Sequence, residues 1–208
     1  MRTCRILVAF VIILLVGVGT YLYTGSYPIG ADVPHSGAVF ALLSAVRDRG
    51  IEAQSRNIHP PADLSTPRRL SVGAGQYAAM CSGCHLAPGY RSGETWEGLY
   101  PQPPQLARGT HLTPGQIFWV VKHGLKFSGM PAWGKSHSDD EIWSITAFVL
   151  SVPHLTAQQY KDIVARAPSD ADMVKMPMPQ ARGAGDGSPD GQASQTVPRP
   201  STRGQKPP

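Results

Sequence analysis

The short stretch from Met80 to His85, MCSGCH, constrains this chain more than any other part of its sequence. It places Cys81 and Cys84 three positions apart, with His85 directly after the second cysteine. Three kinds of site use such a pattern: a redox-active dithiol, half of a zinc site, and an attachment site for a covalently bound c-type haem. The rest of the sequence has to decide among these three.

A zinc site or a redox dithiol would need support that the sequence does not give. Structural zinc usually takes four ligands in two paired clusters. The only further cysteine is Cys4, and the other histidines are scattered along the chain. A thioredoxin-like dithiol normally follows a β-strand and opens a helix. Here the two cysteines end a predicted helix, in a region without a strand pattern. Both interpretations are therefore disfavoured.

A c-type haem requires a second axial ligand downstream of His85 and a helical frame around it. The stretch SGMPAWG at 128–134 places Met130 in a Gly-Met-Pro turn, and the proline stiffens the loop that presents it. Methionine is a soft ligand that favours reduced iron and raises the reduction potential. Met130 is thus the leading candidate for the sixth ligand, with His123, His137 or an open position as alternatives.

Helical periodicity and capping residues predict an all-α domain from about residue 66 to residue 155. The first helix has Thr66 as its N-cap and Pro67 at its first position. Apolar residues then recur on one face as far as Cys81. No stretch of the chain shows the alternation typical of a β-strand.

Two further helices begin with capping boxes. The second helix starts with Thr113 and Gln116 and ends at Gly124. The third starts with Ser138 and Glu141. Together the three helices make a domain of about 90 residues, which is small for an apolar core of its own. A covalently bound haem would supply the missing centre.

The N-terminus carries a candidate membrane segment. Arg2 and Arg5 precede residues 6–23, a run of 18 residues without a charge. As a helix they span ~27 Å, enough for the hydrocarbon core of a bilayer. We expect residues 1–24 to be an uncleaved transmembrane anchor, with a signal peptide cleaved near residues 17–19 as the alternative. The leading basic residues place the rest of the chain outside the cytoplasm in both cases.

Residues 25–65 are predicted to form an extracytoplasmic linker with one amphipathic helix. The helix is expected over 36–49 and is expected to end at Gly50. Its apolar face is formed by Val39, Leu42, Leu43 and Val46. That face needs a cover, which would be the main domain or a partner subunit.

Residues 156–208 are predicted to be a flexible tail rich in Pro and Gly. Met173, Met176 and Met178 lie close together there, and accidental composition explains them better than a copper site. The net charge of +5 is spread along the chain, so no basic face for nucleic acid is predicted. Protein partners are favoured instead.

At residues 66–155 the sequence resembles the class I cytochromes c. The first helix and attachment motif carry the resemblance through Gly73, Tyr77 and CSGCH. YPQPPQL resembles the proline-and-leucine segment of the family beside the haem, and GMPAWG resembles its axial-methionine loop. DDEIWSITAFVLSV is similar to the C-terminal helix of the family, in which an aromatic residue crosses the first helix near a glycine. The wider string from LYPQPPQL to DDEIW resembles membrane-anchored bacterial monohaem cytochromes c.

The resemblance implies a class I cytochrome c fold with one haem c, bound covalently through Cys81 and Cys84. His85 and Met130 would be the axial ligands of the iron. Pro104 resembles the proline whose carbonyl oxygen accepts a hydrogen bond from His85 Nδ1, and Pro88 and Pro103 are alternatives to it.

The function that follows is one-electron transfer by a carrier tethered to the periplasmic face of a bacterial inner membrane. Two filled axial positions leave no site for a substrate, so the chain is not expected to be an enzyme. Its partners would be a redox donor and a redox acceptor, and no nucleic acid. The alternatives are a haem c subunit of a larger dehydrogenase or oxidase complex, and a haem-based ligand sensor.

Overall fold

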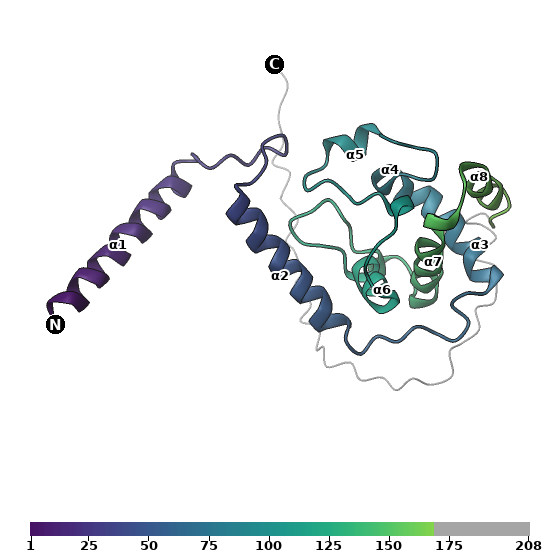
Figure 1. Cartoon of the computed structure of the whole chain (residues 1–208), viewed down its shortest axis with the longest axis horizontal. Coiled ribbons are helices and arrows are strands. Elements are labelled where there is room, and N and C mark those ends of the chain that lie inside the picture. The colour runs from purple at the N-terminus through teal and green to yellow at the C-terminus, as the bar shows by residue number, and fades with distance from the viewer. Residues whose placement is uncertain (169–208) are drawn as a thin grey trace, which may run out of the picture. The chain divides into compact units, whose positions relative to one another are not determined.

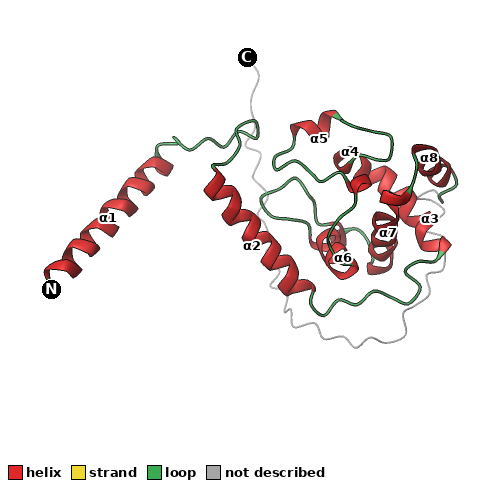
Figure 2. Ribbon diagram, viewed as in Figure 1, coloured by secondary structure: helices red, strands yellow, loops and turns green. Residues whose placement is uncertain are grey.

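Every regular element of the described residues is a helix, as the sequence predicts (Figures 1 and 2). The computed structural model describes residues 1–168. Most of the predicted flexible tail, with its three methionines, therefore lies outside the described residues. The absence of strands in residues 1–168 agrees with the lack of alternating patterns in the sequence.

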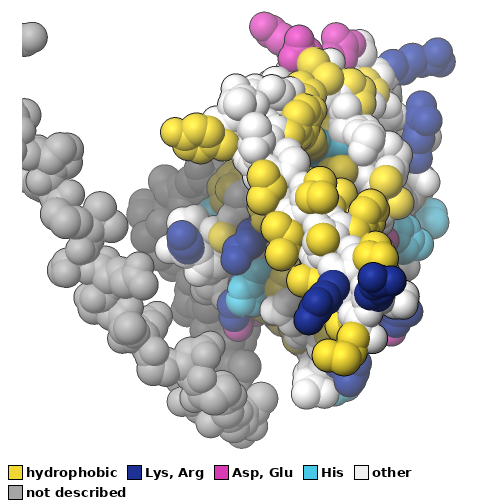
Figure 3. All heavy atoms as spheres, turned by 90° about the vertical axis from the view of Figure 1, so that its left-hand side faces the viewer, with side chains coloured by type: hydrophobic (Ala, Val, Ile, Leu, Met, Phe, Trp, Pro, Cys, Tyr) yellow, Lys and Arg dark blue, Asp and Glu magenta, His cyan; other side chains and the backbone are white. Residues whose placement is uncertain are grey.

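The first helix, α1 (Arg2–Tyr23), is apolar along its whole length and leaves its side chains exposed. Figure 3 shows apolar side chains spread along it. Within the described part of the chain it is the one helix long and apolar enough to cross a membrane. The charged side chains of α1, Arg2 and Arg5, both lie in its first turn, and the rest of the helix is uncharged.

The second helix, α2 (Gly37–Ser55), is longer than predicted. The prediction that Gly50 ends it is wrong, because Gly50 has no left-handed backbone and the helix continues through it. The following residues are good helix formers, and Ile51 gains burial against the domain at 4% exposure. Burial of this last part of the helix outweighs the low helix propensity of glycine.

The predicted apolar face of α2 is only partly covered. Ile51 and Ser55, near its C-terminal end, are buried, and the helix packs against α6 (Pro114–His123). Phe40, Leu42 and Val46, in its first half, remain exposed. The main domain thus covers the end of α2, whereas in its first half Val39 and Leu43 are half-buried and the other three large apolar side chains are exposed.

The core of the domain forms where α3 (Pro67–Gln76) crosses α7 (Asp139–Ser151). A Cβ atom added to Gly73 would collide with the carbonyl oxygen of Ser144, so the two backbones approach closely only because residue 73 is glycine. One turn further on, the rings of Tyr77 and Phe148 lie 5.4 Å apart, and both side chains are fully buried. Apolar residues of α6 complete this core.

The predicted helix starts and stops are confirmed at α6 and α7. Both capping boxes are formed, that of Thr113 with Gln116 and that of Ser138 with Glu141. Gly124 ends α6 with φ +66°, a left-handed conformation that glycine adopts without strain. Pro67 starts α3, although the hydroxyl of Thr66 makes no capping hydrogen bond there.

Buried Arg69 joins the linker to the core. Its guanidinium lies 2.6 Å from the carboxylate of Asp140 on α7 and 3.0 Å from that of Asp63, which precedes α3. It also donates to the carbonyl oxygen of Asp140 at 3.0 Å. No sequence pattern predicts this network, because its three residues are ordinary surface types with no characteristic spacing.

The domain continues beyond the boundary predicted at residue 155. Helix α8 (Ala157–Ala165) begins with a third capping box, formed by Thr156 and Gln159. Tyr160 on α8 is buried, and its ring centroid lies 6.3 Å from that of Tyr77. The predicted boundary is therefore too early, since this tyrosine belongs to the core.

The remaining elements are short: η1 (Tyr77–Cys81), α4 (Ser82–His85), α5 (Glu94–Gly98), η2 (Leu106–Arg108), η3 (Trp133–Lys135) and η4 (Val152–His154). η1 is a π-helical turn and the other three η elements are 3-10 turns. Long stretches between α4, α6 and α7 are irregular, and they carry the candidate site.

Candidate functional site: a haem-attachment motif between two loops

The CSGCH motif lies at the end of one nearly continuous helical run. α3 passes through the π-helical turn η1 into the single turn α4, which ends at His85. Such π turns often occur at functional sites, because the extra residue in the turn redirects the side chains that follow. Ser82 Oγ donates to the carbonyl oxygen of Ala78 at 2.8 Å and closes this turn.

The two cysteines differ in exposure. Cys81 is buried at 8% exposure within the core cluster, and Cys84 is half-buried. Burial, with a smaller contribution from Cys84, raises the pKa of the Cys81 thiol to about 12. A thiol with such a pKa reacts slowly in disulfide exchange near neutral pH, because that reaction uses the thiolate. The described residues also hold no group of three or more side chains suited to a metal ion.

The chain turns sharply just after His85. Leu86 has φ +60° and is buried, which is rare for a residue with a large side chain. The hydroxyl of Tyr77 donates to the carbonyl oxygen of Leu86 at 2.7 Å and holds this turn in place. The core thereby fixes the position of the residue that follows the histidine.

His85 has a defined tautomer. Its Nδ1 lies 2.9 Å from the carbonyl oxygen of Pro104, and a carbonyl oxygen can only accept, so Nδ1 carries the proton. The other ring nitrogen, Nε2, is then left with a free lone pair for a metal ion. Burial lowers the pKa of His85, and this effect outweighs the hydrogen bond to the Pro104 carbonyl, which raises the pKa. The lowered pKa favours the neutral ring.

The structure distinguishes the three candidate prolines. Pro104 is the one whose carbonyl meets His85. The carbonyl oxygen of Pro103 instead accepts from the indole Nε1 of Trp96, on α5, at 2.8 Å. Pro88 is buried just beyond the turn at Leu86. Trp96 therefore holds the loop that presents Pro104, a role that no sequence signal indicated.

Met130 lies on the second loop of the site, between α6 and η3. Its backbone amide donates to Ser128 Oγ at 3.2 Å, and its carbonyl oxygen accepts from Leu125 at 3.3 Å. Gly124 lies against the same backbone, because a Cβ there would come within 2.8 Å of the carbonyl oxygen of Met130. The Met130 side chain is half-buried and packs against the core cluster that includes Cys81.

The two histidines considered in place of Met130 have other surroundings. His123 is exposed at the end of α6, and its ring centroid lies 5.0 Å from that of Trp119. His137 Nδ1 lies 2.9 Å from the hydroxyl of Ser136. Met130 adjoins the same core cluster as the attachment motif, which suits a ligand of the same iron.

The two loops of the site also touch each other. A Cβ added to Gly129 would lie 2.7 Å from Leu99 Cδ2, so Leu99 packs directly on the backbone next to Met130. Leu99 belongs to the loop that leads to Pro104. The loop near the histidine and the loop of the methionine are thus in contact.

A donor set of two cysteine sulfurs, an imidazole with a fixed tautomer and a loop-borne thioether fits haem c, and fits a lone metal ion poorly. Together with the helical fold, it defines a class I c-type cytochrome domain. Residues 68–149 match the family described as "Cytochrome C oxidase, cbb3-type, subunit III". A domain of this class binds haem c and transfers electrons.

No curated protein matches the chain, but two solved structures resemble it. One is the Kuenenia stuttgartiensis reducing HAO-like protein complex Kustc0457/Kustc0458, with 24% identity, a TM-score of 0.39, and coverage of 49% of this chain and 53% of that one. The other is cytochrome CL from the marine methylotrophic bacterium Methylophaga aminisulfidivorans, with 20% identity, a TM-score of 0.34, and coverage of 64% of this chain and 83% of that one. The chain thus spans about half the length of the first.

Proposed function

We propose that this chain is a membrane-tethered periplasmic monohaem cytochrome c that transfers one electron at a time, with His85 and Met130 as axial ligands. The hydrogen bond between His85 and Pro104 is the observation that carries the proposal. It leaves Nε2 of the histidine that follows CxxC free to bind iron. Such a bond also orients the ring and makes it a stronger donor.

Cys81 and Cys84 would hold the cofactor covalently. Each sulfur would be joined to one vinyl-derived carbon of the haem by a thioether bond. Haem c supplies a reversible one-electron couple when bound. The chain contributes the ligands, the shelter from water and the position near partners.

Met130 would be the second axial ligand. Its loop is shaped by Gly124, by the hydroxyl of Ser128 and by Leu99, so the thioether is presented from a defined backbone. Occupation of both axial positions by His85 and Met130 would leave no place for a substrate. A carrier, and not an enzyme, follows from that ligand set.

Helix α1 would tether the domain to the bacterial inner membrane. Its length and composition suit a membrane span, and its leading basic residues favour a periplasmic position for the haem domain. Donor and acceptor would then be redox proteins of the same compartment or membrane.

A second candidate is a haem c subunit of a larger oxidase or dehydrogenase complex. The exposed apolar residues Phe40, Leu42 and Val46 on α2 favour it, because such a surface suits contact with another protein. The matched family is itself named for an oxidase subunit. Purification in mild detergent separates the two candidates: a carrier elutes alone, and a complex subunit elutes with stoichiometric partners.

The haem assignment is tested by expressing the full chain with a working haem-maturation system. The pyridine adduct of the purified protein should have the spectrum of haem c, and acidified organic solvent should fail to extract the haem. The double variant Cys81→Ser, Cys84→Ser should lose the covalent haem. A chain without haem under these conditions would overturn the proposal.

Carbon monoxide separates the carrier from a ligand sensor. The reduced native protein should not bind it without denaturant, because Met130 occupies the sixth position. Rapid binding by the native protein would instead indicate an open or labile position.

A further inference from the structure

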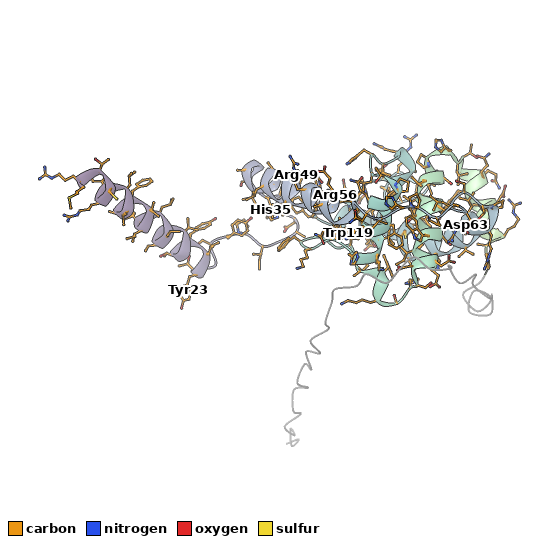
Figure 4. All side chains as sticks on the ribbon, turned by 90° about the horizontal axis from the view of Figure 1, so that it is seen from below. Tyr23, His35, Arg49, Arg56, Asp63 and Trp119 are labelled. Carbon is orange, nitrogen blue, oxygen red and sulfur yellow. The ribbon has the colours of Figure 1, made fainter. Side chains whose placement is uncertain are left out.

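His35 lies between two tyrosines from distant parts of the chain. Its Nδ1 is 2.9 Å from the hydroxyl of Tyr27, and its backbone amide donates to the hydroxyl of Tyr100 at 3.0 Å. Its ring meets that of Tyr100 edge to face, with centroids 5.3 Å apart, and lies roughly parallel to that of Tyr27. Figure 4 labels His35 in the segment that leads into α2. Both the backbone and the ring of this histidine are therefore engaged.

These contacts extend to the end of the membrane helix. The ring of Tyr27 meets that of Tyr21, in the last turn of α1, edge to face at 6.4 Å. Residues 24–36 connect α1 to α2, and we call them the juxtamembrane segment. Aromatic contacts thus run from α1 through this segment to Tyr100.

On the other side, the contacts reach both loops of the haem site. Tyr100 lies in the loop that carries Pro104, the hydrogen-bond partner of His85. Its neighbour Leu99 packs on Gly129, beside Met130. The surroundings of both proposed axial ligands are thereby connected to the juxtamembrane segment.

The burial pattern of the juxtamembrane segment is not that of a free tether. Apart from Ile29 and Val33, which are both exposed, most of its residues are polar, small or turn-forming, and such a composition would serve as a flexible spacer. Tyr27 and His35 are nevertheless half-buried, while every other residue from 24 to 36 is exposed. The two covered residues are the two that bond to each other, and one of them bonds to the domain. Selective burial of this kind indicates a specific contact between the juxtamembrane segment and the domain.

We propose that Tyr27, His35 and Tyr100 form a latch that docks the juxtamembrane segment on the haem-site loops and holds the haem plane at a fixed angle to the bilayer. His35 is the positioning residue of this latch. The inference rests on the proposed function, since it needs a haem and a membrane anchor. A fixed angle favours electron exchange with a partner held in the same membrane over exchange with a freely diffusing one.

Two variants and two controls test the latch. Tyr100→Phe removes the hydroxyl that accepts from the His35 amide and keeps the ring, and His35→Ala removes the ring contacts. Tyr90→Phe and His59→Ala are matched controls, because both residues are exposed. All are prepared as full-length protein in lipid bilayers.

Hydrogen exchange of the His35 amide measures the docking of the juxtamembrane segment on Tyr100, and this measurement does not depend on the haem. We expect native protein and both controls to protect this amide, and Tyr100→Phe to exchange it at least about tenfold faster, as for the loss of ~1.4 kcal/mol of protection. Equal exchange in native protein and Tyr100→Phe would overturn the docking.

A second measurement, of the haem orientation relative to the bilayer, tests whether the latch holds the haem at a fixed angle. In stacked oriented bilayers, the electron paramagnetic resonance of the oxidised haem should depend strongly on the field angle in native protein and controls. The angular dependence should weaken in Tyr100→Phe and His35→Ala, while their visible spectra stay native. Unchanged angular dependence in both variants would overturn the latch. Loss of the haem signal in every sample, with protection of the His35 amide intact, would overturn the proposed function and leave the docking standing.

Discussion

The buried hydroxyl of Tyr77 donates a 2.7 Å hydrogen bond to the carbonyl oxygen of Leu86, which connects the helix core to the turn directly after His85. Leu86 has φ +60°, a conformation that a leucine adopts only when its surroundings impose it. One hydrogen bond in the core thus supports the geometry of the haem-attachment motif.

Replacing Tyr77 by Phe should therefore destabilise the protein. We expect a loss of about 1–3 kcal/mol in the free energy of unfolding, because the carbonyl of Leu86 is left buried without a partner. Urea denaturation of the haem-loaded protein measures it. Tyr90→Phe, at an exposed tyrosine, should change the value by less than about 0.5 kcal/mol. Equal effects of the two variants would show that the Tyr77 hydroxyl contributes nothing.

Gly73→Ala should destabilise the crossing of α3 and α7. The added methyl group would collide with the backbone of Ser144, and overpacking of this kind costs about 1–3 kcal/mol. Gly50→Ala is the matched control, because Gly50 is also a helical glycine and has no atom within 3.9 Å of an added Cβ. It should gain about 0.5–1 kcal/mol from helix propensity. Thermal denaturation should move the two midpoints in opposite directions, and a neutral Gly73→Ala would contradict the packing described.

Within residues 1–168, Phe127 is the other large residue with a left-handed backbone, at φ +61°, and it is 82% exposed. Phe127→Gly should raise the free energy of unfolding by about 1 kcal/mol, since glycine adopts this conformation without strain. Phe127→Ala keeps the Cβ that causes the strain, so it should leave stability within about 0.5 kcal/mol of native. A loss of stability in Phe127→Gly would mean that the ring has a contact worth more than the strain.

Trp96→Phe should alter the electronic environment of the haem iron. The indole of Trp96 holds the carbonyl of Pro103, beside the carbonyl of Pro104 that bonds His85. Loosening this loop weakens the bond to His85, makes the histidine a poorer donor and disfavours oxidised iron. The reduction potential should rise, by at most about 59 mV, which is a tenfold change for one electron. A potentiometric titration measures the shift, and a fall in potential would contradict the assigned role of Pro104.

The parts of the fold that sequence reasoning predicted are those with local chemical rules. Capping boxes at Thr113 and Ser138 fix helix starts, and Gly124 fixes a stop, because each acts within a few residues. CSGCH is equally local, but its spacing alone is compatible with three kinds of site, and the Met130 loop and the helical frame are needed to favour haem. The resemblance to the cytochromes c also predicted the hydrogen bond between His85 and Pro104, because the matching residues lie in short recognisable segments.

What sequence reasoning missed depends on contacts between distant residues. α2 runs past Gly50 because Ile51 is buried against the domain, and α8 is part of the core because Tyr160 meets Tyr77. The π-helical turn before Cys81 and the contact between His35 and Tyr100 leave no periodic signal either. The capping box at Thr156 was a local signal that could have extended the predicted domain.

The red end of the visible spectrum of the oxidised protein tests the central claim most directly, because sulfur ligation of haem iron by methionine gives a weak band there. We predict this band in native protein, its loss in Met130→Leu and its retention in Met80→Leu, a change of equal volume at a methionine packed against the same core cluster. A band that survives in Met130→Leu, or that is absent from the native protein, would contradict His85–Met130 ligation.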